Sequence, residues 1–220
     1  MPITVAADPR CFPRRGALEP RRTALVVIDM QKDFCRAGGY YEAIGGDPGR
    51  LSVVVPTIAA VLAAARRTGL RIVHTRVGRR AEAWAGSDAP GADACGPMGR
   101  HLVRGEEGWQ IVPELAPGEG EAVVDKGATG AFHGTDLDGL LRRWGVDGLV
   151  VCGVTTAICV STSVREAHDR GYEVLVLGDA CAEGDALSHA AALASFQLEN
   201  GLLATVAPAV AFIAALGRLP

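Results

Sequence analysis

The segment GLVVCGVTTAICVSTSVREAHDRGYEVLVL, residues 148–177, decides the fold that we predict for this chain. It begins with an apolar run of strand length at residues 148–152 and passes through a glycine and two threonines into a helix that begins near Thr156. A second apolar run follows at residues 173–177. Strand-length apolar runs that alternate with helix-length segments are typical of a parallel sheet flanked by helices. This segment therefore predicts one strand–helix–strand unit of an α/β fold.

The same alternation extends over the chain from residue 23 onward. Further strands are predicted at residues 24–29, 71–77, 121–125 and 202–206, and further helices at residues 52–68, 135–144, 185–199 and 208–216. Strands this continuously apolar are expected where helices cover both faces of a sheet. The prediction is a three-layer, doubly wound α/β fold with six mainly parallel strands and five helices. We assign residues 1–22 to an N-terminal extension, residues 23–220 to this single domain and residues 78–108 to a long surface loop.

Composition favours a small-molecule partner. The 220 residues are 49% hydrophobic and 21% charged, with a net charge of -3, so there is no overall basic field to bind nucleic acid or an anionic membrane. No segment has the pattern of a signal peptide or of a membrane span, and we expect a cytoplasmic chain. No glycine-rich phosphate-binding motif is present, so no nucleotide cofactor is predicted. His74 has no second metal ligand at a suitable spacing, and we interpret it as a core histidine rather than a metal ligand.

Six cysteines, at positions 11, 35, 95, 152, 159 and 181, form no CxxC pair, which disfavours a zinc ribbon or a disulfide framework. Most of them are expected to be reduced and to pack as small apolar side chains. Cys159 differs because it falls in the first turn of a predicted helix. Backbone N–H groups and the helix dipole there favour a thiolate, so we predict a lowered pKa and a nucleophilic role. Cys152 lies within the apolar strand and is assigned to the core.

Two further polar residues stand at strand ends. Asp29 ends the first predicted strand, where a carboxylate has no packing role, and Lys126 directly follows the third. In parallel sheets ligands bind outside the carboxyl ends of the strands, so we expect Asp29, Lys126 and Cys159 to face one crevice. Asp29 is then the base and Lys126 the cation that keeps its neighbours ionised. The alternatives are that Asp29 caps a loop or helix and that Lys126 pairs with Asp125. Residues 38–41, GGYY, are predicted to form a loop at the mouth of this crevice.

Three motifs resemble the isochorismatase-like cysteine hydrolases: IDMQKDFC (residues 28–35), DKGATGAF (residues 125–132) and VVCGVTTAICVSTSVREAHDRGYEVLVLGDACA (residues 150–182). The resemblance covers residues 20–216. It implies a catalytic triad of Asp29, Lys126 and Cys159, an oxyanion hole formed by the backbone N–H groups of Thr155 and Cys159, and a cis peptide bond between Val154 and Thr155. It also implies that the reaction needs no metal or cofactor and that the chain forms homodimers or homotetramers.

The resemblance also distinguishes subfamilies. Cys159 points away from isochorismatase itself, which lacks the nucleophile, and the Asp/His/His metal site of nicotinamidases is absent. The likeness is strongest to biuret hydrolases and related ureido amidohydrolases, partly through GRHLVRGEEGWQIVPELAP, residues 99–117. It implies hydrolysis of a C–N bond in a small amide or ureido compound through a covalent thioester or thiocarbamate. The residues that it implies for substrate binding are Phe34, Tyr40, Gln197 and Glu199.

Two departures from the biuret hydrolase pattern leave other readings open. Glu199, or Gln197 after a two-residue slip, stands where a glutamine is expected, and Ala157 replaces an acidic residue. An extra carboxylate favours a cationic or NH-rich substrate, which suits the lactam opened by streptothricin hydrolase, a relative in this family. Readings from other classes are a non-catalytic binding domain and a redox sensor in which Cys152 or Cys181 resolves an oxidised Cys159.

Overall fold

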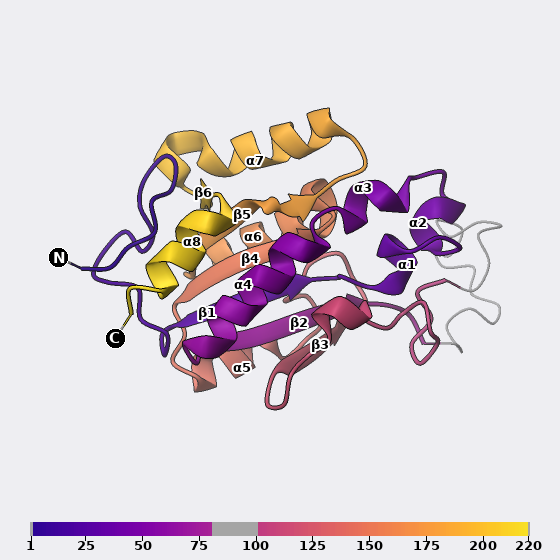
Figure 1. The fold of residues 1–220 in the computed structure, drawn as a ribbon, viewed down its shortest axis with the longest axis horizontal. Helices are drawn as coiled ribbons and strands as arrows, with labels where there is room; N and C mark the ends of the chain where they lie inside the picture. The colour runs from indigo at the N-terminus through magenta and orange to yellow at the C-terminus, as the bar shows by residue number, and fades with distance from the viewer. Residues whose placement is uncertain (1, 81–100, 220) are drawn as a thin grey trace.

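A computed structural model describes residues 2–80 and 101–219, and its centre is one parallel sheet (Figure 1). The strands lie in the spatial order β3-β2-β1-β4-β5-β6, and every pairing between them is parallel. The winding therefore reverses between β1 and β4, which confirms the predicted doubly wound topology. The strands are β1 (Thr23–Ile28), β2 (Arg71–Val77), β3 (Ala122–Lys126), β4 (Gly148–Val154), β5 (Glu173–Ala182) and β6 (Thr205–Ala207).

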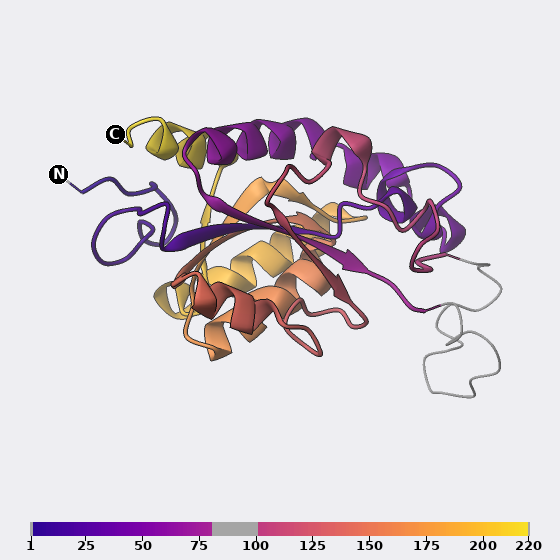
Figure 2. The same cartoon turned by 90° about the horizontal axis from the view of Figure 1, so that it is seen from below.

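Helices cover both faces of this sheet (Figure 2). One face carries α4 (Val55–Arg67) and α8 (Ala209–Leu216), and the other carries α5 (Leu137–Arg143), α6 (Ser161–Asp169) and α7 (Ala186–Gly201). Helix α4 buries Ile58, Val61, Leu62 and Ala65, a spacing that places them on one side of a helix, against the sheet. Burial from both faces explains why all the residues of β1 and β4 are apolar or small and all are buried.

Among the described residues, four short helices were not predicted: α1 (Lys32–Cys35), α2 (Tyr40–Ala43), α3 (Pro48–Ser52) and the 3-10 helix η3 (Pro113–Leu115). Each is about one turn long, too short to show the periodicity by which longer helices are found. The prediction of a loop at residues 38–41 is wrong at its end, because α2 begins at Tyr40. The helix predicted at residues 52–68 is confirmed as α4, which begins three residues later than predicted, at Val55, after a turn at residues 53–54.

Two strands extend two or more residues past their predicted ends. Strand β4 continues to Val154, and β5 continues five residues past its predicted end, to Ala182. The segment Pro48–Arg67 is the one helical stretch within the described residues that has the length and apolar composition of a membrane span. It contains α4, whose apolar side forms part of the core. Of the surface loop predicted at residues 78–108, residues 81–100 lie outside the described part of the chain.

The N-terminal segment packs closely onto the domain. Val5 and Phe12 are fully buried, and Asp8 forms an antiparallel bridge with Val206 of β6 through backbone hydrogen bonds of 2.8 and 2.9 Å. This pairing satisfies part of the outer edge of β6, which is otherwise an open sheet edge. Figure 1 shows this segment in indigo beside β6 and α8.

Candidate active site

Asp29, Lys126 and Cys159 meet at the carboxyl edge of the sheet. Lys126 Nζ lies 2.7 Å from Asp29 Oδ2 and 3.5 Å from Cys159 Sγ. Asp29 and Lys126 are fully buried, and Cys159 is 7% exposed. Asp29 follows β1, Lys126 ends β3, and Cys159 lies in η4 (Thr156–Val160), a turn of π-helix that joins β4 to α6. Turns of π-helix occur frequently at functional sites. The structure thus brings together the three side chains that the strand-end argument selected.

Thr75 fixes the orientation of the Asp29 carboxylate. Its hydroxyl donates to Asp29 Oδ1 at 2.6 Å and accepts from the Asp29 backbone N–H at 3.2 Å. Asp29 has a φ of 51°, a left-handed conformation that is unfavourable for a residue other than glycine. Such strain is typical of functional positions held by their surroundings. The alternative in which Asp29 caps a helix is wrong, because the carboxylate contacts Thr75 and Lys126 while the N-cap of α1 is Gln31.

Lys126 is held in place by the loop that follows it. Its ammonium donates to the carbonyl oxygens of Ala128 and Thr129 at 2.9 and 2.8 Å. Burial acts to lower the pKa of Lys126, but the charge of Asp29 and the contacts with Asp29 and Cys159 outweigh it, and the pKa is raised. The lysine is therefore an ammonium ion at neutral pH. The alternative partner Asp125 instead accepts a hydrogen bond from Arg76 at 2.8 Å.

The pKa of Cys159 is raised to about 12, which overturns the lowered pKa predicted from its position in the chain. Burial is the largest cause, the charge of Asp29 adds to it, and Lys126 opposes both. The sequence placed the sulfur at the start of a helix but did not show that it is enclosed beside a carboxylate. The resting site therefore holds a thiol, a carboxylate and an ammonium ion. The raised pKa disfavours the redox-sensor alternative, because oxidation of a cysteine is favoured by thiolate character.

This pKa predicts how Cys159 reacts with iodoacetamide. We expect slow alkylation at neutral pH, because only the thiolate reacts. Between about pH 7 and about pH 10 the rate should rise about tenfold per pH unit without levelling off, because this whole range lies below the pKa of Cys159. Peptide mass spectrometry distinguishes Cys159 from the exposed Cys11, which serves as the internal reference. A rate for Cys159 that levels off near neutral pH would contradict the raised pKa.

The turn before Cys159 requires close approach of two backbones. Gly153 has a φ of 119°, and a Cβ at this position would lie 2.1 Å from the carbonyl oxygen of Ile28. Only glycine therefore allows β4 to pass so close to β1 at this point. The peptide bond between Val154 and Thr155 is cis, as the resemblance implied. Thr155 and Cys159 line the same pocket, while the oxyanion role of their N–H groups stays a prediction.

Ser163 links the Lys126 loop to the helix that follows Cys159. Its hydroxyl donates to the Cys159 carbonyl at 2.7 Å and accepts from the Ala131 N–H at 3.0 Å. Ser163→Ala leaves that buried N–H unpaired, so we expect a loss of about 1–3 kcal/mol in the free energy of unfolding. Urea denaturation measures this loss of stability. The control is Thr162→Ala, at the preceding and less buried position. Equal stability of the two variants would mean that the Ser163 bonds contribute nothing.

A pocket of about 410 Å³ opens above Cys159. Phe34 and Tyr40, both predicted to bind substrate, line it, and their rings meet edge to face with centroids 5.7 Å apart. Two charged residues that the sequence analysis missed also line it, Arg79 after β2 and Glu183 directly after β5. The strand-end argument that selected Asp29 and Lys126 applies to both of them. The sequence analysis missed Glu183 because it predicted that β5 ends five residues too early.

The assignment of Gln197 and Glu199 to substrate binding is contradicted by the structure. Helix α7 begins at the carboxyl edge of the sheet and runs back along it, so its last turns lie near the amino ends of the strands (Figure 1). There the Gln197 side chain donates to Asp8 in the N-terminal segment. Glu199 lies within the bend that the chain makes at residues 198–200. Neither residue lines the pocket. The argument for a lactam substrate from Glu199 therefore fails.

His74 has a structural role, as predicted. It is buried, its Nε2 lies 2.9 Å from a Glu121 carboxylate oxygen, and burial lowers its pKa. Within residues 2–80 and 101–219, no three His, Cys, Asp or Glu side chains are grouped so that they could hold a metal ion.

Comparison with known proteins gives a consistent picture. The sequence profile of the isochorismatase domain matches residues 23–208. The ureidoacrylate amidohydrolase RutB of Serratia proteamaculans (strain 568) is 33% identical over 190 residues, which is 81% of this chain and 75% of that protein. The crystal structure of a cysteine hydrolase from Pseudomonas syringae pv. phaseolicola 1448A matches with a TM-score of 0.78 and 29% identity, over 92% of this chain and 96% of that one. N-carbamoylsarcosine amidase from Thermoplasma acidophilum matches with a TM-score of 0.68 and 29% identity, over 86% and 96% of the two chains.

Proposed function

The chain belongs to the isochorismatase family, and from this premise we propose that it is a cysteine-dependent amidohydrolase of small ureido compounds. It is a hydrolase that acts on carbon–nitrogen bonds other than peptide bonds. The observation that carries the proposal is the buried contact of one ammonium group with both a carboxylate and a thiol, at 2.7 and 3.5 Å. The ureido substrate class is supported by the names of two similar proteins, a ureidoacrylate amidohydrolase and an N-carbamoylsarcosine amidase.

In the first half of the reaction, Asp29 takes the proton of the Cys159 thiol as the sulfur attacks the substrate carbonyl. Burial raises the pKa of this thiol, so in this proposal its proton passes to Asp29 as the sulfur attacks. The ammonium group of Lys126, 3.5 Å from the sulfur, stabilises the negative charge that develops there. The carbonyl oxygen becomes an oxyanion, and in this proposal the backbone N–H groups of Thr155 and Cys159 bind it.

In the second half, the intermediate collapses and the C–N bond breaks. The protonated Asp29 gives its proton to the leaving nitrogen, which departs as ammonia or an amine, and the acyl group remains on the sulfur as a thioester or thiocarbamate. A water molecule then loses a proton to Asp29 and attacks the same carbonyl. The thiolate leaves, regains its proton from Asp29, and the acid or carbamate product is released. Lys126 remains an ammonium ion throughout.

A substrate panel with trapping of the intermediate tests this proposal. The panel contains ureidoacrylate, N-carbamoylsarcosine, biuret and a lactam, with ammonia release and product mass as readouts. We expect hydrolysis of at least one ureido compound, and acid quenching during turnover should leave an acyl or carbamoyl group on the peptide that contains Cys159. The mass of that group shows which nitrogen leaves first. Turnover with no modified Cys159, even under rapid quenching, would contradict the covalent route, and a gain of water without ammonia on the lactam alone would contradict the ureido substrate class.

A further inference from the structure

The turn η4 carries the groups on which the proposed reaction depends. Thr155 precedes it as the N-cap residue, and Cys159 lies within it. The backbone N–H groups of Ile158 and Val160 donate to the Thr155 carbonyl at 3.2 and 3.1 Å, which closes the turn from inside. The side chain of Thr155 accepts from none of the described N–H groups of the turn. The N–H group of Ala157, near the start of the turn, therefore needs an acceptor from another element.

Glu183, directly after β5, supplies that acceptor. Its Oε2 accepts a hydrogen bond from the Ala157 N–H, and its Oε1 accepts one from the Gly184 N–H, both at 2.9 Å. Both carboxylate oxygens are thus engaged by backbone N–H groups. A carboxylate at the start of a helical turn is also electrostatically favourable, because the N–H groups there carry partial positive charge. Glu183 therefore caps η4, although it comes from a different strand.

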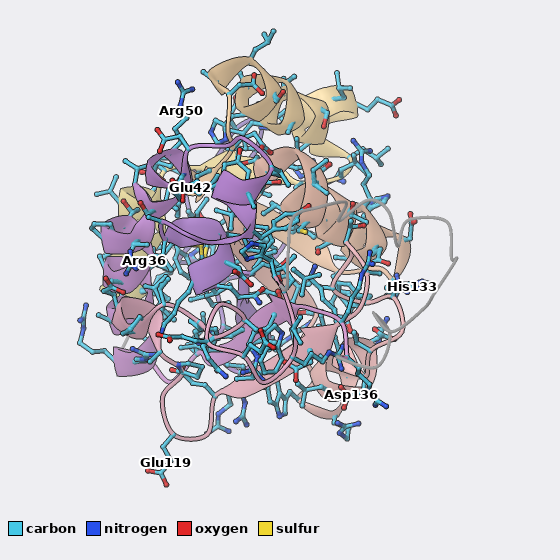
Figure 3. The ribbon with its side chains drawn as sticks, turned by 90° about the vertical axis from the view of Figure 1, so that its right-hand side faces the viewer. Arg36, Glu42, Arg50, Glu119, His133 and Asp136 are labelled. Carbon is cyan, nitrogen blue, oxygen red and sulfur yellow. The ribbon has the colours of Figure 1, made fainter. Side chains whose placement is uncertain are left out.

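The position of Glu183 is itself fixed by neighbouring elements. Arg50, in α3, donates from Nη1 to the carbonyl oxygen of Gly184 at 3.0 Å. Gly184 also packs against Tyr41, because a Cβ at position 184 would lie 1.8 Å from the Tyr41 hydroxyl oxygen. In Figure 3, which faces the right-hand side of Figure 1, Arg50 lies on the upper side of the molecule, the side along which α7 runs. The carboxylate is therefore presented by a turn that α2 and α3 hold in place.

A second side chain from the same part of the chain reaches η4. His189, near the start of α7, has its Nδ1 2.9 Å from the hydroxyl oxygen of Thr156. Thr156 is fully buried and lies between Thr155 and Ala157. The segment of residues 183–189 thus holds the start of η4 through polar side-chain atoms at two successive residues.

We propose that Glu183 is a positioning residue, whose carboxylate holds the start of η4 so that the Cys159 sulfur and the proposed oxyanion donors are correctly placed for attack. In this role the carboxylate does not react, because both of its oxygens face backbone N–H groups. It also occupies the Ala157 N–H, which leaves the N–H groups of Thr155 and Cys159 for the oxyanion. A displacement of about 1 Å in such a site can reduce a rate by about 100-fold. This inference rests on the proposed function and adds to it a residue that acts through the turn.

Steady-state kinetics of Glu183→Ala and Glu183→Gln tests this role, with the ureido compound that the wild-type protein hydrolyses. Glu183→Ala should lower kcat by about 10- to 100-fold, the factor that corresponds to one hydrogen bond with a charged partner, and should change KM by less than about threefold. Glu183→Gln keeps an oxygen that can accept from the Ala157 N–H, so it should recover most of the lost kcat. A rise in KM in both variants, without rescue by glutamine, would make Glu183 a substrate-binding residue and overturn the positioning role.

The matched control is Asp179→Ala. Asp179, in β5, also accepts a hydrogen bond from a backbone N–H at the start of a helix, that of Ala209 in α8, at 2.6 Å. Its substitution should lower stability to urea about as much as Glu183→Ala does, but it should leave kcat unchanged, because neither Asp179 nor Ala209 lines the pocket above Cys159. An equal loss of kcat in Asp179→Ala and Glu183→Ala would mean that general destabilisation lowers the rate, and it would overturn the inference.

Amide hydrogen exchange, followed by NMR, tests the same role without turnover. Exchange of the Ala157 amide should become about 10- to 100-fold faster in Glu183→Ala, because the amide loses its acceptor, and should stay slow in Glu183→Gln and Asp179→Ala. This result supports the positioning role even if ureidoacrylate, N-carbamoylsarcosine and biuret are all inert and the proposed function fails. Unchanged exchange at Ala157 in Glu183→Ala overturns the inference, and turnover by the wild-type protein then leaves the ureido hydrolase proposal standing.

Discussion

Cys159→Ser is expected to lower kcat for the ureido substrate by about 10⁴-fold or more, the scale of loss when a catalytic nucleophile is removed. A serine hydroxyl is a much weaker acid than a thiol, and the Asp29 carboxylate is too weak a base to activate it. The fold should be retained, because serine is close to cysteine in size and the pocket already admits a polar group there. Steady-state kinetics gives kcat, and thermal unfolding verifies that the variant is folded.

The control for this substitution is Cys11→Ser, which changes an exposed cysteine far from the site in the N-terminal segment. It should keep wild-type kcat. Retention of more than a tenth of the activity by Cys159→Ser would mean that the sulfur does not attack the carbonyl. A variant that binds substrate normally but does not turn it over is the result expected from loss of the nucleophile alone.

Lys126→Met is expected to reduce both activity and stability. It leaves the Asp29 carboxylate buried without the cation that lies 2.7 Å away, and it removes the donor to the carbonyls of Ala128 and Thr129. Breaking a buried pair in this way typically costs about 3–5 kcal/mol in the free energy of unfolding. kcat should fall by about 10³-fold, because the developing charge on Cys159 loses its cation. Urea denaturation and steady-state kinetics measure the two effects.

The pH dependence of Lys126→Met gives an independent measurement of the same interaction. Without the lysine, the buried Asp29 carboxylate has no cation beside it, so the cost of burying its charge is present only at pH values where it is ionised. The stability deficit of the variant should then shrink as the pH falls and grow as the pH rises. The double variant Asp29→Asn, Lys126→Met, which has no charge to bury, should recover most of the stability but none of the activity. A single variant within about 1 kcal/mol of wild type at neutral pH would show that the pair is not stabilising.

The sequence predicted the sheet well because its strands are buried on both faces. Continuous apolar runs such as residues 24–28 have no other stable position in a chain of this size, and the helices between them are long enough to show their period. Once the strands are known, their carboxyl ends share an edge, and this alone is enough to place Asp29, Lys126 and Cys159 together. The same argument failed for Glu183 only because a strand end is the least certain part of such a prediction.

Two errors concerned properties that local sequence does not encode. The pKa of Cys159 depends on how completely the site is closed and on a carboxylate 130 positions earlier in the chain (159 − 29 = 130), and neither is visible in the turn around the cysteine. The positions of Gln197 and Glu199 depend on the direction in which α7 runs. A helix that leaves the carboxyl edge of a parallel sheet must return to the opposite edge, and these residues lie at its end.

The three residues proposed for catalysis and the two other charged residues that line the pocket lie on different strand ends. Asp29 follows β1, Lys126 ends β3 and Cys159 lies in the turn after β4. Arg79 follows β2 and Glu183 follows β5. Substitutions at Arg79 or Glu183 therefore change the charge of the pocket lining without removing a reacting group. This separation would let the pocket lining evolve in the short segments after β2 and β5 while the three proposed catalytic residues stay unchanged.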